Sequence, residues 1–219
     1  MQGGIRVDMG RIFKEVIEDS KGFFVTGTNT DIGKTFFSSI LLKYTKGVYF
    51  KPIQTGEKDR DIVKENTCLD ESHFIEEKYH FKEPVSPHYA AEKANVNIDL
   101  NRITLPDSLD KKIVVEGAGG VFAPIGKKLY MIDIIKRISL PTIVVAEDTL
   151  GTINHTLLTL NSLVAYNCKV SFIVLNRYNP ESYNYTAICE ITQLPVLRIP
   201  VMQKFPSDEE IRRVFDEQI

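Results

Sequence analysis

The stretch Gly22–Thr35, GFFVTGTNTDIGKT, constrains the fold of this chain more than any other. An apolar, β-branched run leads into a polar turn bracketed by Gly27 and Gly33, and the apolar segment Phe36–Leu42 follows. This order of strand, loop and helix is typical of a phosphate-binding loop, in which backbone N–H groups and a helix N-terminus attract anions. The strict pattern G-x-x-x-x-G-K-[ST] is not met, because Thr28 occupies the first-glycine position. The flanking strand and helix favour a nucleotide triphosphate site over an incidental turn.

Two side chains of this loop carry its expected chemistry. Lys34 would reach the terminal phosphates of the nucleotide. The Thr35 hydroxyl would bind the magnesium ion that accompanies them. A nucleotide triphosphate and Mg²⁺ are therefore the expected ligands.

The composition is that of an ordinary globular protein. With 219 residues, 43% hydrophobic and 26% charged, the chain fits one large α/β domain. The formal net charge of -2 gives no electrostatic case for binding nucleic acid or an anionic membrane. Cys68, Cys168 and Cys189 form neither a zinc pattern nor a disulfide framework, which favours a reducing cytoplasm. No stretch approaches the length of a membrane span.

Residues 1–21 form an extension that precedes the loop domain, which spans residues 22–219. Charges interrupt this extension, so it does not read as a signal peptide. Met9 is an alternative start site, and Met1–Asp8 is expected to derive from cloning or from a misplaced start. The spacing of Ile12, Phe13, Val16 and Ile17 predicts a short helix, to which no function is assigned.

Beyond the loop, apolar β-branched runs alternate with segments of helical periodicity. Five further strands are expected at Val48–Phe50, Lys112–Val115, Pro141–Ala146, Val170–Leu175 and Val196–Ile199. Helices are expected at Phe36–Tyr44, Met131–Ile138, Thr152–Tyr166, near Tyr183–Gln193, and after a capping box at Ser207 and Glu210. The alternation predicts an α/β fold with a doubly wound, mostly parallel sheet and helices on both faces. Cys68–Leu105 gives the weakest pattern, with a loop-to-helix entry before Tyr89–Lys93.

Residues with chemical potential follow the expected strands. In such a sheet the ligand lies outside the carboxyl ends of the strands, so these residues should meet at one edge. They are Gly27–Thr35, Lys51, Glu116, Asn176 and Pro200. This convergence is the strongest argument for a site after the loop itself.

The segment after the second expected strand reads as a loop, because Pro52 and Gly56 lie so close together. Lys51 would be held near the phosphates and would suit an anionic substrate or intermediate, although an ordinary surface lysine is the alternative. Thr55 adds a hydroxyl donor within reach of the same ligand. The charged stretch Glu57–Asn66 is expected to be a solvated loop that enters a helix.

Glu116 precedes the glycine-rich run Gly117–Gly120. A carboxylate in this position resembles the acidic second metal site of phosphate-loop enzymes, and the glycines leave room for a ligand. Asp59 and Asp61 lie in the charged segment, where either could bind magnesium or simply be solvated. The four histidines show no ligand spacing, and His155 is expected to pack or cap a helix.

These motifs together resemble dethiobiotin synthetase, a family of the deviant phosphate-loop NTPase-like fold. The resemblance covers about residues 23–202 and is carried by Gly27–Thr35, Lys51-Pro52-x-x-Thr55-Gly56, Val115–Gly120, Pro124-Ile125, Leu150-Gly151-x-Ile153-Asn154-His155 and Asn176. It implies an ATP-dependent carbon–nitrogen cyclo-ligase of biotin synthesis. Its substrates would be 7,8-diaminononanoate and CO₂, and it would proceed through a carbamate and a carbamic–phosphoric mixed anhydride to dethiobiotin, ADP and phosphate.

The resemblance also implies roles for individual residues. Lys51 and Lys34 would be catalytic, Thr55 and Lys51 would bind the substrate, and Thr35, Asp61 and Glu116 would bind magnesium. The nucleotide would contact Asp31, Ile32, Gly33, Lys34, Thr35, Phe36, Asp61, Glu116, Gly117, Ala118, Gly119, Asn176, Arg177, Pro200, Val201 and Met202. The family forms homodimers with the substrate near the subunit interface, which the turn at Gly151–His155 would fit. No ribose-contacting acid is assigned after Met202.

Other functions remain open from the residues alone. A partitioning or switch ATPase of the related class usually carries a second lysine early in the loop, where Gly27-Thr28-Asn29 has none. An amidoligase that acts on another small acid is chemically closer. A nucleotide-binding module without catalysis fits the second lysine and the glutamate least well.

Overall fold

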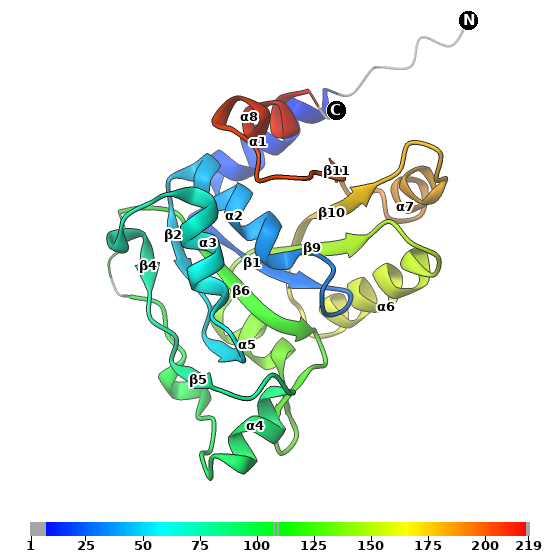
Figure 1. Cartoon of the computed structure of the whole chain (residues 1–219). Coiled ribbons are helices and arrows are strands. Elements are labelled where there is room, and N and C mark those ends of the chain that lie inside the picture. The colour runs from blue at the N-terminus through cyan, green and yellow to red at the C-terminus, as the bar shows by residue number, and fades with distance from the viewer. Residues whose placement is uncertain (1–7, 107, 109, 218–219) are drawn as a thin grey trace, which may run out of the picture.

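A seven-stranded sheet in the order β11-β10-β9-β1-β6-β2-β4 forms the centre of the computed structural model (Figure 1). The structure describes residues 8–106, 108 and 110–217. Every neighbouring pair in this sheet is parallel. The strands are β1 (Gly22–Gly27), β2 (Val48–Phe50), β4 (Phe74–Ile75), β6 (Ile113–Gly120), β9 (Thr142–Glu147), β10 (Val170–Tyr178) and β11 (Val196–Pro200).

Helices cover both faces of this sheet. Side chains alternate along each strand, so Phe23 and Val25 of β1 pack on one face and Phe24 packs on the other. One face carries α1 (Met9–Asp19), α2 (Lys34–Thr45), α3 (Asp59–Thr67) and α8 (Asp208–Asp216). The other carries α5 (Met131–Ile138), α6 (Thr152–Ala165) and α7 (Asn184–Thr192). The predicted doubly wound parallel α/β fold is confirmed.

Two strands run further than the sequence predicted. β6 continues beyond Glu116 through the glycines to Gly120, and β10 continues through Asn176 to Tyr178. Both extensions contain a register shift, next to Gly27 in the β1–β6 pair and between Asn176 and Tyr178 in the β10–β11 pair. Glu116 and Asn176 therefore lie on ordered strand backbone and not in loops.

The prediction that the chain stays a loop after Lys51 is wrong. Pro52 interrupts the strand hydrogen bonding after β2, because it lacks an N–H group. A new strand, β3 (Ile53–Thr55), follows at once and pairs in parallel with β5 (Tyr79–Phe81). The Pro52 carbonyl accepts hydrogen bonds from the backbone N–H groups of Lys78 and Tyr79 at 3.0 and 3.1 Å. The remaining elements are η1 (Glu71–His73), α4 (Pro87–Lys93), η2 (Leu100–Arg102), β7 (Pro124–Gly126) and β8 (Leu129–Tyr130).

The N-terminal segment contains the predicted helix, α1. Asp8 caps it, since its carboxylate accepts a hydrogen bond from the backbone N–H of Arg11 at 3.1 Å. Phe13 and Ile17 are buried, as the helical spacing predicts. The remainder of the segment predicted to derive from cloning or from a misplaced start, residues 1–7, lies outside the described part of the chain.

Candidate active site

The phosphate loop joins the carboxyl end of β1 to the first turn of α2. Gly33, with a φ of 94°, adopts the left-handed backbone conformation that places the loop over the helix N-terminus. The Asn176 side chain fixes the loop from the neighbouring part of the sheet, because its amide Nδ2 donates to the Ile32 carbonyl at 2.9 Å. A Cβ atom on Gly33 would lie 2.1 Å from that Nδ2 atom. Glycine is therefore required at this position.

Lys34 lies inside the loop. Its side chain is 6% exposed, and Nζ donates to the Asn29 carbonyl at 2.8 Å. Burial lowers the pKa of Lys34 to about 8, against the attraction of Glu116. A cation in these surroundings is stabilised by added negative charge, which is what nucleotide phosphates would supply.

Lys51 and Glu116 meet because β2 and β6 are neighbours in register. Phe50 pairs with Val115, so the two residues that follow lie side by side at the edge of the sheet. Lys51 Nζ lies 3.2 Å from Glu116 Oε1. Burial alone would lower the pKa of Lys51, but the carboxylates of Glu116 and Asp59 outweigh it and the pKa is raised.

Glu116 is held on both of its carboxylate oxygens. Thr35 Oγ1 donates to Oε1 at 2.8 Å, and the Tyr49 hydroxyl donates to Oε2 at 3.0 Å. The residue is fully buried. Burial, reinforced by the Glu116 carboxylate, raises the pKa of Tyr49 well above its usual value, so this hydroxyl stays a donor.

Asp59, and not Asp61, completes this cluster. Its carboxylate forms an ion pair with Lys51, and its Oδ2 lies 3.2 Å from Thr35 Oγ1, whose proton is directed at the nearer Glu116. Helix α3 begins at Asp59, which places Asp61 two residues further along the helix, where it is exposed. The geometry therefore brings Asp59 to the cluster, while Asp61, which the resemblance assigned to the metal and the nucleotide, lies outside it.

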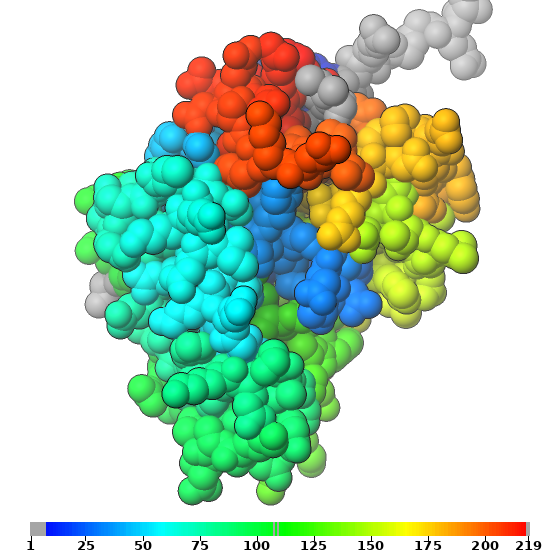
Figure 2. Space-filling view, viewed as in Figure 1, coloured from blue at the N-terminus to red at the C-terminus, as the bar shows by residue number. Residues whose placement is uncertain are grey.

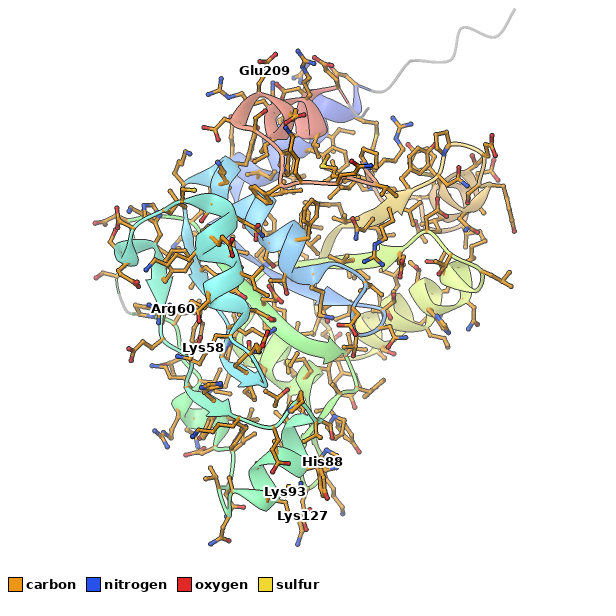
Figure 3. The ribbon with its side chains drawn as sticks, in the orientation of Figure 1. Lys58, Arg60, His88, Lys93, Lys127 and Glu209 are labelled. Atoms are coloured by element: carbon orange, nitrogen blue, oxygen red, sulfur yellow. The ribbon has the colours of Figure 1, made fainter. Side chains whose placement is uncertain are left out.

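The residues that flank Asp59 point away from the cluster. Lys58 pairs with Glu77 at 3.4 Å, and Arg60 pairs with Glu71 at 2.6 Å. Figure 3 shows both residues near the first turn of α3, toward β4 and β5. In the charged segment the side chains of Lys58 and Arg60 point away from the cluster, and the carboxylate of Asp59 between them points into it.

The donor set fits a magnesium ion. Thr35, Asp59 and Glu116 bring a hydroxyl and two carboxylates together, which are the hard oxygen ligands that Mg²⁺ prefers. No group of three His, Cys, Asp or Glu residues that could hold a metal occurs among the described residues. An ion here would therefore also need substrate oxygens, as is usual for magnesium bound with nucleotide phosphates.

A pocket of about 760 Å³ opens over these groups. In Figure 2 the blue phosphate loop lies at the centre of this side of the molecule, beside the cyan residues of α3. Of the residues predicted for the site, the pocket is lined by Asp31, Gly33, Lys34, Thr35, Lys51, Thr55, Glu116, Ala118, Gly119 and Arg177. Ile32, Phe36, Gly117, Asn176 and Asp61 do not line it.

The pocket also contains residues that sequence reasoning missed. Gln54 lies beside Lys51, and its Oε1 accepts a hydrogen bond from the backbone N–H of Asp59 at 3.3 Å. Gln54 lies between the predicted site residues Lys51 and Thr55 in the sequence, and this position could have indicated that it belongs to the site. Pro84–Pro87 forms a wall from a distant part of the chain, and nothing in its sequence indicates this position.

A second pocket of about 600 Å³ lies beyond the end of β11. Pro200, Val201 and Met202, predicted to lie beside the nucleotide base, line it together with residues of α8. It is separate from the phosphate pocket and shares no lining residue with it. Strand β11 pairs with β10, where Ile199 lies opposite Asn176, the residue that holds the phosphate loop.

Comparison with known proteins identifies the family. A family model described as "AAA domain" matches residues 21–208. The ATP-dependent dethiobiotin synthetase BioD of Lawsonia intracellularis is 38% identical over 205 residues, which cover 88% of this chain and 98% of the relative. The chain belongs to the dethiobiotin synthetase family. The BioD protein of Paramagnetospirillum magneticum is 36% identical over 195 residues, which cover 85% of this chain and 95% of that relative.

Solved structures confirm the α/β fold that was predicted for this chain. A ParA family ATPase from Chlorobium tepidum superposes with a TM-score of 0.54 at 13% identity, covering 91% of this chain and 90% of that one. The MinC:MinD cell division complex of Aquifex aeolicus gives 0.52 at 13% identity, with 89% and 94% covered. These similarities extend to the phosphate-loop α/β fold alone. The predicted class, an ATP-dependent carbon–nitrogen ligase, is that of the dethiobiotin synthetases. Within the described residues, no helix has the length and apolarity that a membrane crossing requires.

Proposed function

We propose that this chain is an ATP-dependent dethiobiotin synthetase that closes the ring of 7,8-diaminononanoate with CO₂. The observation that carries the proposal is the position of Lys51. It lies beside Thr35 and Glu116, next to a phosphate loop, in a pocket large enough for a small substrate. A partitioning or switch ATPase would carry its second lysine early in the loop, whereas here the second buried lysine follows β2 and the early loop has none.

ATP would bind with its phosphates on the backbone of the loop that Asn176 holds. Lys34 would contact the terminal phosphates, and the loop backbone with the α2 N-terminus would supply the remaining positive field. The base would lie toward Pro200–Met202, in the second pocket. Arg177, which lines the phosphate pocket and pairs with Glu147, adds another cation on this side.

Magnesium would be held by Thr35, Asp59 and Glu116 together with phosphate oxygens. When bound, it would withdraw negative charge from the phosphates as the γ-phosphorus is attacked. Tyr49 keeps the Glu116 carboxylate in place through its hydrogen bond to Oε2. Such a partner behind a ligand orients that ligand.

The chemistry requires two anions to approach each other. One amine of the substrate combines with CO₂ to give a carbamate, whose oxygen attacks the γ-phosphorus as the bond to ADP breaks. The second amine then attacks the carbonyl carbon of this mixed anhydride, loses a proton and expels phosphate. Lys51 would lie over the carbamate and phosphate oxygens and offset their charge in both transition states. Thr55, at the edge of the same pocket, would contact the diamine.

We also propose a homodimer. Phe122 and Leu158 are exposed apolar side chains that line one hollow next to the phosphate loop, together with His155. Exposed apolar surface of this kind is typical of a protein contact. A partner subunit there would lie close to the substrate pocket, since Ala123 lines both hollows.

The deciding assay is the release of ADP from ATP in the presence of diaminononanoate and bicarbonate, with dethiobiotin identified by mass spectrometry. We expect ADP and dethiobiotin to form in equal amounts and only when the diamine is present. ADP release at the same rate without the diamine would favour a switch ATPase. Turnover with a different amino acid and none with the diamine would favour another amidoligase.

A further inference from the structure

Helices α1 and α8, from the two ends of the described chain, pack against each other at one end of the molecule (Figure 1). The family match covers residues 21–208. It therefore leaves out all of α1 and all of α8 except its first residue. This helix pair thus lies almost wholly outside the segment that the family model matches.

The contact between the two helices is close. A Cβ atom on Gly10 of α1 would lie 2.1 Å from the carbonyl oxygen of Asp216, the last residue of α8. Lys14 Nζ lies 3.0 Å from the Asp216 carboxylate. Glycine at position 10 thus allows the α1 backbone to touch the C-terminal end of α8.

Below this contact the helices share an apolar cluster. Phe13 and Phe215 are fully buried in it, and the Phe13 ring lies 5.1 Å from the ring of Phe172 in β10. The Phe215 ring lies 4.3 Å from that of Tyr44 in α2. A closely packed interior transmits displacement, so the position of α8 depends on α1.

Helix α8 is also a wall of the second pocket. Glu210, Arg213 and Val214 line it, opposite the segment that follows Pro200. Val214 is only 5% exposed and belongs to the same cluster as Phe13. Val214 thus lines the second pocket and also packs in the apolar cluster to which α1 contributes Phe13. Glu209 instead projects outward from α8 (Figure 3) and pairs with Arg213.

We propose that α1 is a positioning element for the nucleotide: it holds α8 as a wall of the base pocket and so sets the affinity for ATP without contacting ATP. This inference rests on the proposed function, in which the base lies beside Pro200–Met202. The phosphate loop and the Lys51 cluster lie outside the helix pair, so α1 contains none of the groups proposed for the chemical step.

The first test is amide hydrogen exchange on the full chain, with and without ATP and magnesium, after calorimetry has established binding. We expect ATP to slow exchange in α8 and also in α1, which lines neither pocket. Helix α7 (Asn184–Thr192), on the opposite face of the sheet, is the internal control and should change less. Binding of ATP with no added protection in α1, or with equal protection in α7, overturns the inference and leaves the proposed function intact. Absence of ATP binding overturns both.

The second test is Gly10→Val, which forces α1 away from the end of α8. We expect KM for ATP to rise by about tenfold, within the twofold to thirtyfold range of such indirect couplings, while kcat and KM for the diamine stay unchanged. Arg11→Val is the matched control, because its exposed position does not face Asp216 and should leave KM unchanged.

Two further variants keep the test decisive if Gly10→Val does not fold. Lys14→Ala removes the exposed ion pair to Asp216 and should raise KM for ATP by a smaller factor, which Lys14→Arg restores. An equal loss of kcat and ATP affinity in a folded variant would assign α1 a merely structural role. Unchanged KM for ATP in Gly10→Val and Lys14→Ala would also contradict the proposal.

Discussion

Lys51 Nζ lies 3.2 Å from Glu116 Oε1, and both side chains are almost completely buried, at 6% and 0% exposure. The two residues are separated by 65 positions in the chain. A buried ion pair is tolerated only while both charges are matched, so removal of one partner leaves the other uncompensated. Removal of either Lys51 or Glu116 should therefore destabilise this edge of the sheet, because the remaining buried charge would have lost its partner.

Lys51→Ala should lower kcat by about 100- to 1,000-fold, because the cation that offsets the carbamate and phosphate charges is lost. The affinity for ATP should stay within several-fold, since Lys34 and the loop backbone still hold the phosphates. Single-turnover kinetics and calorimetric titration with ATP separate these effects. Lys58→Ala, whose lysine pairs with Glu77 outside the cluster, is the matched control. Loss of ATP binding with an intact chemical step would show that the role of Lys51 is misassigned.

Asp59→Asn should raise the magnesium concentration required for half-maximal activity by at least tenfold, whereas Asp61→Asn should leave it unchanged. The reason is that the Asp59 carboxylate contacts Lys51 and Thr35, while Asp61 is exposed. Titration of activity with magnesium at saturating ATP provides the measurement. The two variants are matched in chemistry and lie in one helical turn, so the opposite ranking would return the metal role to Asp61.

The meeting of Lys51 and Glu116 could be predicted from the sequence, whereas the choice of Asp59 could not. Both of the former residues follow apolar runs that predict strands, and the carboxyl ends of parallel strands share one edge. Asp59 and Asp61 have identical side chains in one charged stretch, and only the start of α3 decides which faces the site. The segment Cys68–Leu105 gave only a weak pattern, with the entry to α4, because its other elements, such as β4 with two residues, are too short for periodicity.

Contacts made to the site by residues from distant parts of the chain could not be predicted from the sequence either. The hydrogen bond of Tyr49 to Glu116 and the wall formed by Pro84–Pro87 depend on tertiary packing, which local sequence does not encode. The pairing of α1 with α8 is of this kind as well. Each helix was predicted from its own apolar spacing or its capping box, but their contact joins opposite ends of the chain.

Gly33→Ala should weaken ATP binding by tenfold or more while the protein stays folded. The residue has a φ of 94°, where a side chain is strained by about 1 kcal/mol, and its Cβ atom would collide with the Asn176 amide that holds the loop. Gly126→Ala is the control, because its Cβ atom would meet only ordinary contacts at 3.7 Å. Calorimetric titration with ATP and thermal unfolding of both variants provide the readout. ATP affinity equal to that of the parent would show that the loop tolerates displacement of Asn176.

Leu158→Asp should convert the proposed homodimer into monomers. Leu158 is 58% exposed and lines a hollow with Phe122, so a charge there would lose its water in the assembled state. Sedimentation velocity should show the parent at twice the 24.9 kDa chain mass and the variant at the mass of one chain. Ile191→Asp introduces the same charge at a position that is 56% exposed on α7, and it should leave the dimer intact. A monomeric parent, or a variant that stays dimeric, would exclude this face as the subunit contact.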